Sequence, residues 1–518
     1  MLCVIATSFT GCFGRKKSGE AFSMPIMDEP TSLDPQIADS NSEKLVAANC
    51  YEGLVRIMAD GTIGKGVATD WNISDDGLTY TFKLRNNSHW AMFSGHKAVL
   101  GENYEDTFDI TVKAEDFKFG IERTLSEQTG SADAPLFSAV KSISTPDDFT
   151  IVFNLSYADD NFLYALTNPG AMPCDEEFFN LTNGKYGLDA KYLLCNGPFH
   201  VSKWTEKASV KLVKNNEYNG ESSVSPSSVT FYINNNDSEV ADKMNSVTYD
   251  VAFLSSSQFS SIENKKDLNS VAVQNVTYSF IFNQNDNNYR NKNMRLAFCR
   301  SCDTSSLFDS QSDISKADGI VPPSCKIGGE DYRNGNAAEL LSYDETLAKK
   351  NFNDALLELG SSSVETTILC TEQYESFVKQ MVQKLQKTLG VKFVSTVKVV
   401  SESDLEAAVN DGNYSVAFYP FKAKSSFAGE IIEGFDQNNI FGYESDVLSQ
   451  KIRNIKNNSG SLEGERSAVA DAENYLVSEA VIMPVFYENS YFVTSKKTSG
   501  IYFYSSADNV CFINAKKS

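Results

Sequence analysis

Histidine is scarce in this sequence: His89, His96 and His200 are the only three among 518 residues. Their spacing does not suit metal ligation, so zinc sites and histidine-dependent catalytic triads are not expected. The Walker A and dinucleotide-binding glycine motifs are also missing, as are the G-x-S-x-G elbow and the H-E-x-x-H helix. We therefore predict that the protein is not an enzyme and has no catalytic residues, metal or cofactor.

Long hydrophobic runs and excess positive charge are lacking too. Beyond residue 12, no stretch approaches the run of about 18 apolar residues that a membrane-spanning helix needs. The 46 Lys and Arg are outnumbered by 68 Asp and Glu, which gives a net charge of −22. Nucleic acid binding demands a basic face, so this balance argues against a nucleic acid partner. With 41% hydrophobic and 22% charged residues, the chain is globular.

The N-terminus contains one short apolar run, residues 2–11. It is too short to cross a bilayer and has the length and small-residue ending of a signal-peptide core. Cys12 follows Gly11 directly, which resembles the bacterial lipobox, although Phe9 stands where that motif usually has leucine. We predict that residues 1–19 are a lipoprotein signal and tether with lipidation at Cys12. An ordinary buried N-terminal segment is the alternative.

The ten cysteines do not form a recognisable disulfide framework. Beyond Cys12 they are scattered, as buried small hydrophobic residues would be. Cys299 and Cys302 form a C-x-x-C motif, which redox enzymes place at the start of a helix. Here the motif comes late in a helical pattern, without a second pair for zinc. Core packing is the main interpretation, and a redox or metal-linked protein is the alternative.

Local patterns predict both hairpins and a parallel segment. In "LTYTFKLR", apolar residues alternate with polar ones after an Asp-Asp-Gly turn, and "PDDFTIVFNLS" repeats the pattern. Residues 365–419 read as strand, helix, strand, helix, strand, which predicts a mostly parallel sheet with helices on its faces. Ligands of such sheets bind beyond the carboxyl ends of the strands. We therefore expect ligand contacts from Tyr419 onward.

Several segments, taken in order, resemble the family 5 solute-binding proteins, which are the peptide, nickel and haem receptors of bacterial ABC importers. They are "EPTSLDPQIADSNSEKLVAANCYEGLVRI", "VKAEDFKFGIER", "NGPFHVSKW", "NKNMRLAF", "GIVPPS", "ETLAKKNFNDALLELG" and "EAVIMPVFYENSYFV". The resemblance covers nearly the whole chain after the signal segment. It implies an α/β, two-lobed periplasmic-binding-protein-like (type II) fold, with an additional N-terminal mixed α/β domain and a hinge between the lobes.

The resemblance also implies the domain boundaries. Lobe I would combine residues 20–60, 190–275 and 490–518, the additional hairpin-rich domain would be 61–189, and lobe II would be 276–489. The implied function is an extracytoplasmic, monomeric receptor, lipid-anchored outside the cell membrane or periplasmic. It would capture a peptide or similar small solute and deliver it to ABC transporter permease subunits. An orphan receptor turned signalling or adhesive surface protein is a further alternative.

The site residues follow from the same resemblance. In the family's peptide receptors, the strand equivalent to "YSVAFYP" is followed by a tryptophan and then by an aspartate that pairs with the peptide's α-ammonium. An ungapped reading places Phe421 and Lys424 there, and a lysine would suit an anionic or neutral group instead. Facing contacts are expected after "LDP". The predicted ligand-binding residues are Asp39, Ser40, Asn41, Ser42, Tyr419, Phe421 and Lys424.

Overall fold

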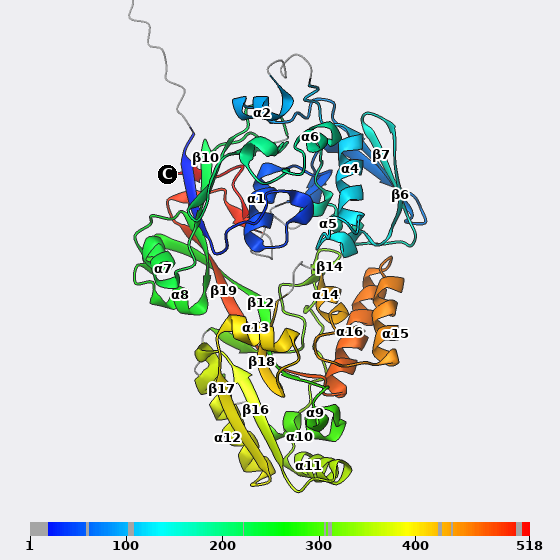
Figure 1. Ribbon diagram of the computed structural model, residues 1–518, viewed down its shortest axis with the longest axis vertical. Coiled ribbons are helices and arrows are strands. Elements are labelled where there is room, and N and C mark those ends of the chain that lie inside the picture. Colours follow the sequence, from blue (N-terminus) through cyan, green and yellow to red (C-terminus); the bar gives the residue numbers. More distant parts are fainter. Residues whose placement is uncertain are drawn as a thin grey trace, which may run out of the picture.

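The computed structural model describes residues 19–58, 62–101, 108–220, 222–304, 307–308, 313–422, 427–436, 439–503 and 510–518. These residues form an elongated molecule with two halves (Figure 1). We call the two four-stranded sheets with helices α1–α6 the upper half. The lower half contains strands β16–β18 and helices α9–α16. Two long strands, β12 (Leu268–Phe282) and β19 (Ile482–Ser495), run between the halves and are called the hinge strands.

The upper half is built on two sheets that share one hydrophobic core. The first has the order β1 (Ala21–Ile26), β10 (Ser228–Ile233), β9 (Ser209–Lys214) and β8 (Phe199–Thr205), with β1 and β10 parallel. The second is antiparallel, with the order β4 (Ala68–Ile73), β5 (Thr79–Leu84), β7 (Thr150–Leu155) and β6 (Val140–Asp147). The helices of the upper half are α1 (Asn41–Cys50), α2 (Lys97–Leu100), α4 (Ala114–Leu125), α5 (Phe162–Ala165) and α6 (Glu176–Leu181).

The hairpins of the second sheet form as their sequence predicts. Gly77 has φ +69°, a conformation that glycine adopts without strain, and it turns the chain between β4 and β5. Phe82 and Phe153 are fully buried on the apolar faces of β5 and β7, whereas Lys83 is exposed. The alternation therefore decides which face of the sheet meets the core.

The lower sheet has seven strands, in the order β11 (Val251–Ser255), β19, β12, β18 (Val416–Lys422), β16 (Val364–Cys370) and β17 (Phe393–Val399), with β13 (Ile314–Lys316) beside β19. β16 pairs in parallel with β17 and with β18, as the strand–helix alternation predicts. The expectation that the sheet is mostly parallel is wrong, because every other pairing is antiparallel. The hinge strands join the three parallel strands from distant parts of the chain.

Helices of the lower half follow local signals closely. In α12 (Glu375–Leu389) the residues at helical spacing are buried, among them Val378 and Leu385, and Gly390 ends the helix at φ +79°. Ser401 caps α13 (Glu402–Asn410), its Oγ accepting the Asp404 N–H at 3.1 Å. The other helices are α9 (Asn287–Arg290), α10 (Lys292–Ser301), α11 (Glu345–Leu359), α14 (Ala428–Glu433), α15 (Asp446–Asn457) and α16 (Leu462–Ser478).

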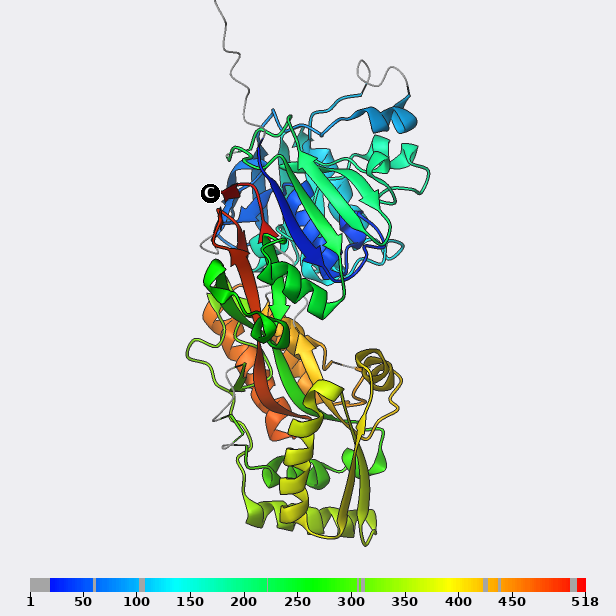
Figure 2. The ribbon, with the colours of Figure 1, turned by 90° about the vertical axis from the view of Figure 1, so that its left-hand side faces the viewer.

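The hinge strands pair antiparallel over almost their whole length, from Leu268 opposite Ser495 to Ile281 opposite Ile482. Figure 2 shows β19 passing from one half to the other. Helices α7 (Asp237–Asn245) and α8 (Ser256–Ser261) pack with β11 at the upper end of this pair. Beyond β19 the chain returns to the upper core, where the Phe512 ring lies 6.2 Å from that of Phe22.

Short elements complete the described chain. The small strands are β2 (Val55–Ile57), β3 (Ile63–Lys65), β14 (Lys326–Ile327), β15 (Glu330–Asp331), β20 (Thr498–Ser499), β21 (Tyr502–Phe503), β22 (Val510–Cys511) and β23 (Lys516–Lys517). Single-turn helices include η1 (Pro35–Ile37) and η3 (Ala134–Phe137). Over the described ranges, none of the helices is both long and apolar enough to cross a membrane.

Candidate ligand cleft between the two halves

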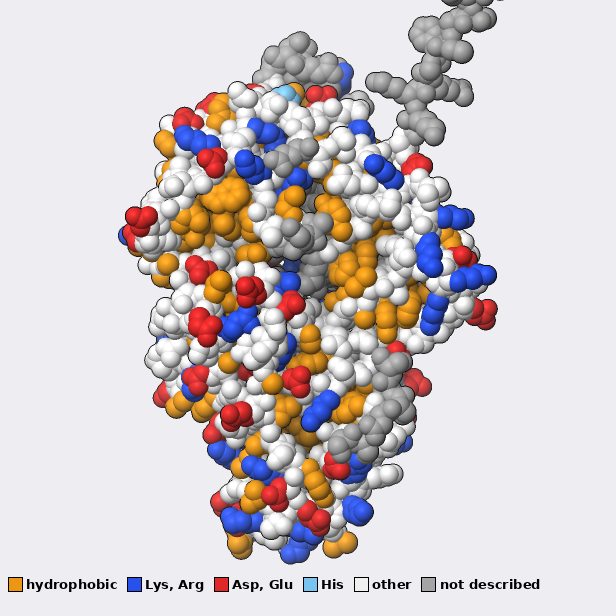
Figure 3. All heavy atoms as spheres, turned by 180° about the vertical axis from the view of Figure 1, so that it is seen from behind, with side chains coloured by type: hydrophobic (Ala, Val, Ile, Leu, Met, Phe, Trp, Pro, Cys, Tyr) orange, Lys and Arg blue, Asp and Glu red, His pale blue; other side chains and the backbone are white. Residues whose placement is uncertain are grey.

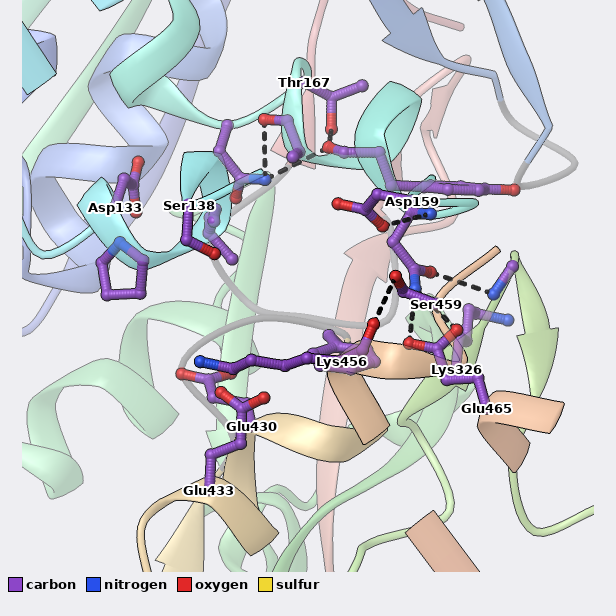
Figure 4. A pocket seen from close by; sticks show the side chains of 18 of the residues that line it. Asp133, Ser138, Asp159, Thr167, Lys326, Glu430, Glu433, Lys456, Ser459 and Glu465 are labelled. Atoms are coloured by element: carbon purple, nitrogen blue, oxygen red, sulfur yellow. Dashed lines mark hydrogen bonds between the residues drawn. The ribbon is translucent and has the colours of Figure 1, made fainter. Parts of the chain in front are cut away.

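A cavity of about 390 Å³ lies between the halves, a size within the usual range for small-molecule sites. Figure 4 shows Asp133, Ser138 and Thr167 on its upper side and Glu430, Glu433 and Lys456 on its lower side. Seen from behind, the surface is hollowed where the halves meet, and acidic side chains gather beside the hollow (Figure 3). The lining includes five carboxylates and three ammonium groups: Asp133, Asp159, Glu430, Glu433, Glu465, Lys44, Lys326 and Lys456.

Asp133 is the buried carboxylate of the upper side. It directly precedes η3, and its Oδ2 accepts the Gly170 N–H at 2.9 Å. Burial raises the pKa of Asp133; Lys44 on α1 lowers it, and Glu430 from the lower half raises it further. Carboxylates of the two halves therefore influence one another across the cavity, with one ammonium group beside them.

The lower side carries a half-buried carboxylate, Glu433, at the end of α14. Burial raises the pKa of Glu433, Lys456 on α15 lowers it, and Glu430 raises it again. The cavity thus presents acidic groups and lysines from both halves. Such a lining can receive a zwitterionic or cationic ligand, because each charged end finds an opposite charge.

Away from the hinge strands, the two halves touch directly. We call this the mouth contact, between residues 158–164 of the upper half and residues 328–329 and 459–465 of the lower half. Asn161 Nδ2 donates to Glu465 Oε1 at 2.9 Å and to Oε2 at 2.8 Å, and the Gly328 N–H donates to Asn161 Oδ1 at 3.2 Å. Burial raises the pKa of Glu465 to about 8.

The predicted residues after "LDP" lie at the start of α1, next to the cavity. The Asp39 and Ser40 N–H groups donate to Glu43 Oε2, and Ser40 Oγ caps the helix. Among the described residues that line the cavity, α1 contributes Lys44 and none of Asp39, Ser40, Asn41 and Ser42. Asp39 lies near enough to raise the pKa of Asp133. Lys44, which the sequence analysis did not name, lies about one turn beyond Ser40 and lines the cavity.

The predicted residues of β18 face a hydrophobic cluster. The Phe421 ring stacks on Phe435 and contacts Phe441, each at 5.7 Å between centroids, and Tyr419 packs against Phe421. Neither Tyr419 nor Phe421 lines the cavity described here. Lys424 lies outside the described residues, as does Cys12. Glu430 and Glu433 lie on α14, beyond the acid-free segment from Tyr419 to Gly429 where ligand contacts were expected, and they were therefore not predicted.

Cys299 and Cys302 line a separate cavity of about 200 Å³ in the lower half. Burial raises the pKa of Cys299 to about 12, and that of Cys302 is raised as well. The reactive form of cysteine is the thiolate, so these thiols are unreactive in this environment. This supports core packing over redox chemistry. In the described part of the chain, no group of three or more His, Cys, Asp or Glu residues is placed to hold a metal ion.

Known proteins share this architecture. Dipeptide-binding protein DppE of Bacillus subtilis (strain 168) is 24% identical over 497 residues, which span 92% of this chain and 88% of that protein. The dipeptide-binding protein of Pseudoalteromonas sp. SM9913, solved in complex with Met-Leu, superposes with a TM-score of 0.77 at 18% identity. That alignment covers 96% of this chain and 100% of the other.

A second solved structure, Listeria monocytogenes OppA bound to peptide, gives a TM-score of 0.75 at 20% identity and covers 97% of this chain and 100% of the other. These likenesses establish the two-lobed type II fold predicted from the sequence. The family model described as bacterial extracellular solute-binding proteins, family 5 Middle, matches residues 62–441. The chain is therefore a solute-binding receptor that belongs to family 5 of the bacterial extracellular solute-binding proteins.

Proposed function

We propose that this receptor captures a short peptide in the cleft between its halves and delivers it to the permease of an ABC importer. The observation that carries the proposal is the cavity of about 390 Å³, lined by carboxylates and lysines from both halves. A peptide has an ammonium and a carboxylate, and such a lining offers both an opposite charge. The peptide-binding relatives support the choice of ligand.

Within the cleft we assign roles by charge. Asp133 and Glu430 would bind a cationic group of the ligand, and Lys44 and Lys456 an anionic group. In the sequence, Lys424 stands between β18 and α14, and two residues of α14, Glu430 and Glu433, line the cavity. We keep the prediction that Lys424 contacts the ligand at an anionic or neutral polar group. Contacts from Asp39, Ser40, Asn41, Ser42, Tyr419 and Phe421 are proposed on the family resemblance.

The test begins with native mass spectrometry of protein purified without refolding, which should reveal bound peptide. Calorimetry with defined di-, tri- and tetra-alanine follows, since these carry both terminal charges and no side-chain charge. Free and N-acetylated forms are compared on the wild type and on Lys424→Asp. A pooled peptide library is tested in the same way. The peptide proposal fails if no peptide copurifies and neither the defined peptides nor the pool binds. The Lys424 prediction fails if the wild type prefers free amines and Lys424→Asp behaves identically.

We also propose that Cys12 is the lipidated N-terminus, which anchors the receptor outside the cell membrane. The lipobox-like Gly11-Cys12 supports this, and a diacylglyceryl group supplies the two chains that stable anchoring needs. In cells, Cys12→Ser should release the protein into the medium. Retention of the variant at the wild-type level would contradict the anchor.

We propose the domain organisation predicted from the sequence. Lobe I combines residues 20–60, 190–275 and 490–518, the additional domain is 61–189, and lobe II is 276–489. The hinge strands would then be the segments that cross between lobes, and the receptor would act as a monomer. Small-angle scattering should show a monomer that compacts when a tightly bound peptide is added. An unchanged scattering profile with a confirmed tight ligand would contradict the hinge.

A further inference from the structure

The mouth contact closes the cleft on the side away from the hinge strands, as the positions of α5, β14 and α16 relative to β12 and β19 show (Figure 1). Two of its hydrogen bonds are accepted by backbone carbonyl groups. Ser459 Oγ donates to the Ala158 carbonyl at 2.7 Å, and the Asp160 N–H donates to the Ser459 carbonyl at 2.6 Å. These hydrogen bonds need the halves to be together, so they exist only when the cleft is shut.

The centre of the mouth contact is the pair Asn161 and Glu465. Both the nitrogen and the oxygen of the Asn161 side-chain amide form hydrogen bonds. Nδ2 donates to both carboxylate oxygens of Glu465, and Oδ1 accepts from the Gly328 N–H. The Asn161 backbone is held by Asp159, whose Oδ1 accepts its N–H at 2.9 Å. One side chain of the upper half thus binds two segments of the lower half in a fixed orientation.

Glu465 has an unfavourable electrostatic environment while the halves touch. The residue is 1% exposed. Burial raises its pKa, the Asn161 hydrogen bonds lower it, and Asp159, Asp160 and Glu433 each raise it further. The carboxylates that face Glu465 come from the segment before α5 and from α14, so two separate elements surround it with negative charge.

The nearby cations are engaged elsewhere. Lys326 Nζ lies 2.8 Å from Asp331 Oδ1, and the charge of Lys456 lowers the pKa of Glu433. Arg466, next to Glu465 on α16, donates to the Tyr332 carbonyl at 2.9 Å. Within the described residues, Glu465 makes no ion pair of its own. Separation of the halves would return the carboxylate to water, where it is an ordinary acid.

We propose that Asn161 and Glu465 form a latch that holds the cleft shut, and that shutting the latch takes up a proton at Glu465. The link to ligand capture rests on the proposed function, whereas the closing movement is independent of any ligand. Because the shut state binds the proton more tightly than the open state, raising the pH favours opening. The shut-to-open ratio should fall by up to about tenfold per pH unit between the ordinary carboxyl range and about pH 8.

The first experiment measures the distance between the halves in the ligand-free receptor. Spin labels are introduced through noncanonical amino acids at Glu122 on α4 and Gln450 on α15, both exposed. Pulsed electron resonance at about pH 6 and about pH 9 should show a larger open population at the higher pH. Glu465→Gln keeps the shape and can still bond Asn161 without a charge, so its distances should change much less with pH.

The matched control is Glu463→Gln, the same change on an exposed residue of the same helix, which should behave like the wild type. Asn161→Ala removes the hydrogen bonds to Glu465 and Gly328 and should raise the open-to-shut ratio roughly tenfold at both pH values. The latch is overturned if the wild type shows no pH-dependent distance, or if Glu465→Gln responds to pH as strongly as the wild type.

The second experiment uses tri-alanine as the probe, with calorimetry in buffers of different ionisation enthalpy. Binding near neutral pH should take up protons in the wild type and fewer in Glu465→Gln. If the distances follow pH but neither tri-alanine nor any pooled peptide binds, the latch stands and the peptide function fails. If tri-alanine binds with equal proton uptake in both proteins, the latch fails and the peptide function stands.

Discussion

On the hinge side of the cleft, β12 and β19 are joined by a backbone ladder, whereas at the mouth the halves meet mainly through side chains. The ladder runs from Leu268 opposite Ser495 to Ile281 opposite Ile482 and does not depend on the charge of any residue. The mouth depends on one amide and one buried carboxylate, Asn161 and Glu465. One side can therefore persist while the other opens. Irregularities at Gln274/Val276 and Tyr278/Ser279 give the ladder places to bend.

The largest expected effect comes from breaking the hinge side. Phe486 on β19 is fully buried, and its ring lies 5.1 Å from Tyr278 and 5.2 Å from Phe377. Phe486→Ala should lower the free energy of unfolding by about 3–5 kcal/mol, since it leaves a cavity in an aromatic cluster. Denaturant unfolding measures this. Val399→Ala, on the exposed edge strand β17, is the control and should cost well under half as much. Equal losses would show that Phe486 is not a core residue of the hinge.

A second prediction separates pH effects at the mouth from pH effects on the fold. His96, fully buried in the upper half, contacts Phe93 and hydrogen-bonds through Nε2 to the Leu193 carbonyl. Burial lowers its pKa to about 4. The folded state therefore resists protonation, so its stability is complete above the unfolded-state pKa, about 6.5, and is lost as the pH falls from there toward about 4.

Because of His96, the free energy of unfolding should fall by up to about 3 kcal/mol at the acidic end of this range. The free energy of unfolding should fall between about pH 7 and about pH 5 in the wild type and less in His96→Gln. His89→Gln, a half-buried histidine elsewhere in the same half, serves as the control. This acid effect has the opposite sign to the latch, which favours the shut state at low pH. An unchanged slope in His96→Gln would refute the assignment.

The local strands and helices within each half were largely predictable from the sequence, whereas the pairing of the two hinge strands and the mouth contact were not. Alternating strands and the helix through Leu385 follow from periodicity that each segment carries by itself, and the order of motifs predicted the two-lobed family. Asn161 and Glu465 are 304 positions apart, and their neighbours carry no motif. Their roles arise only when the halves meet. Lys44 was missed because the resemblance directed attention to residues 39–42, of which Ser40 caps α1 and none lines the cavity.

A third prediction concerns the ligand between the two sides. Glu430 on α14 lines the cavity and raises the pKa of Asp133 from the opposite half. Glu430→Gln should weaken binding of a peptide with a free amine by roughly tenfold, the usual value of a charge-assisted hydrogen bond. Binding of the N-acetylated peptide should change little. Calorimetry compares both peptides, with the exposed Glu444→Gln as control. Equal losses for both peptides would mean that Glu430 supports the cleft without meeting the amine.

The smallest expected effect tests whether the mouth has a single key pair or a distributed contact. Ser459 Oγ lies 2.7 Å from the Ala158 carbonyl oxygen across the mouth and 2.9 Å from the Lys456 carbonyl oxygen of its own half, and its single proton is shared between these two acceptors. Ser459→Ala removes one neutral hydrogen bond between the halves, which contributes about 1 kcal/mol. Peptide affinity should therefore fall only about fivefold, and its pH dependence should stay as in the wild type because no ionisable group changes. Calorimetry at two pH values measures both quantities.

A loss of peptide affinity as large as that of Asn161→Ala would mean that closure is shared evenly along the mouth contact. A changed pH dependence in Ser459→Ala would mean that Glu465 is not the group that makes closure depend on pH.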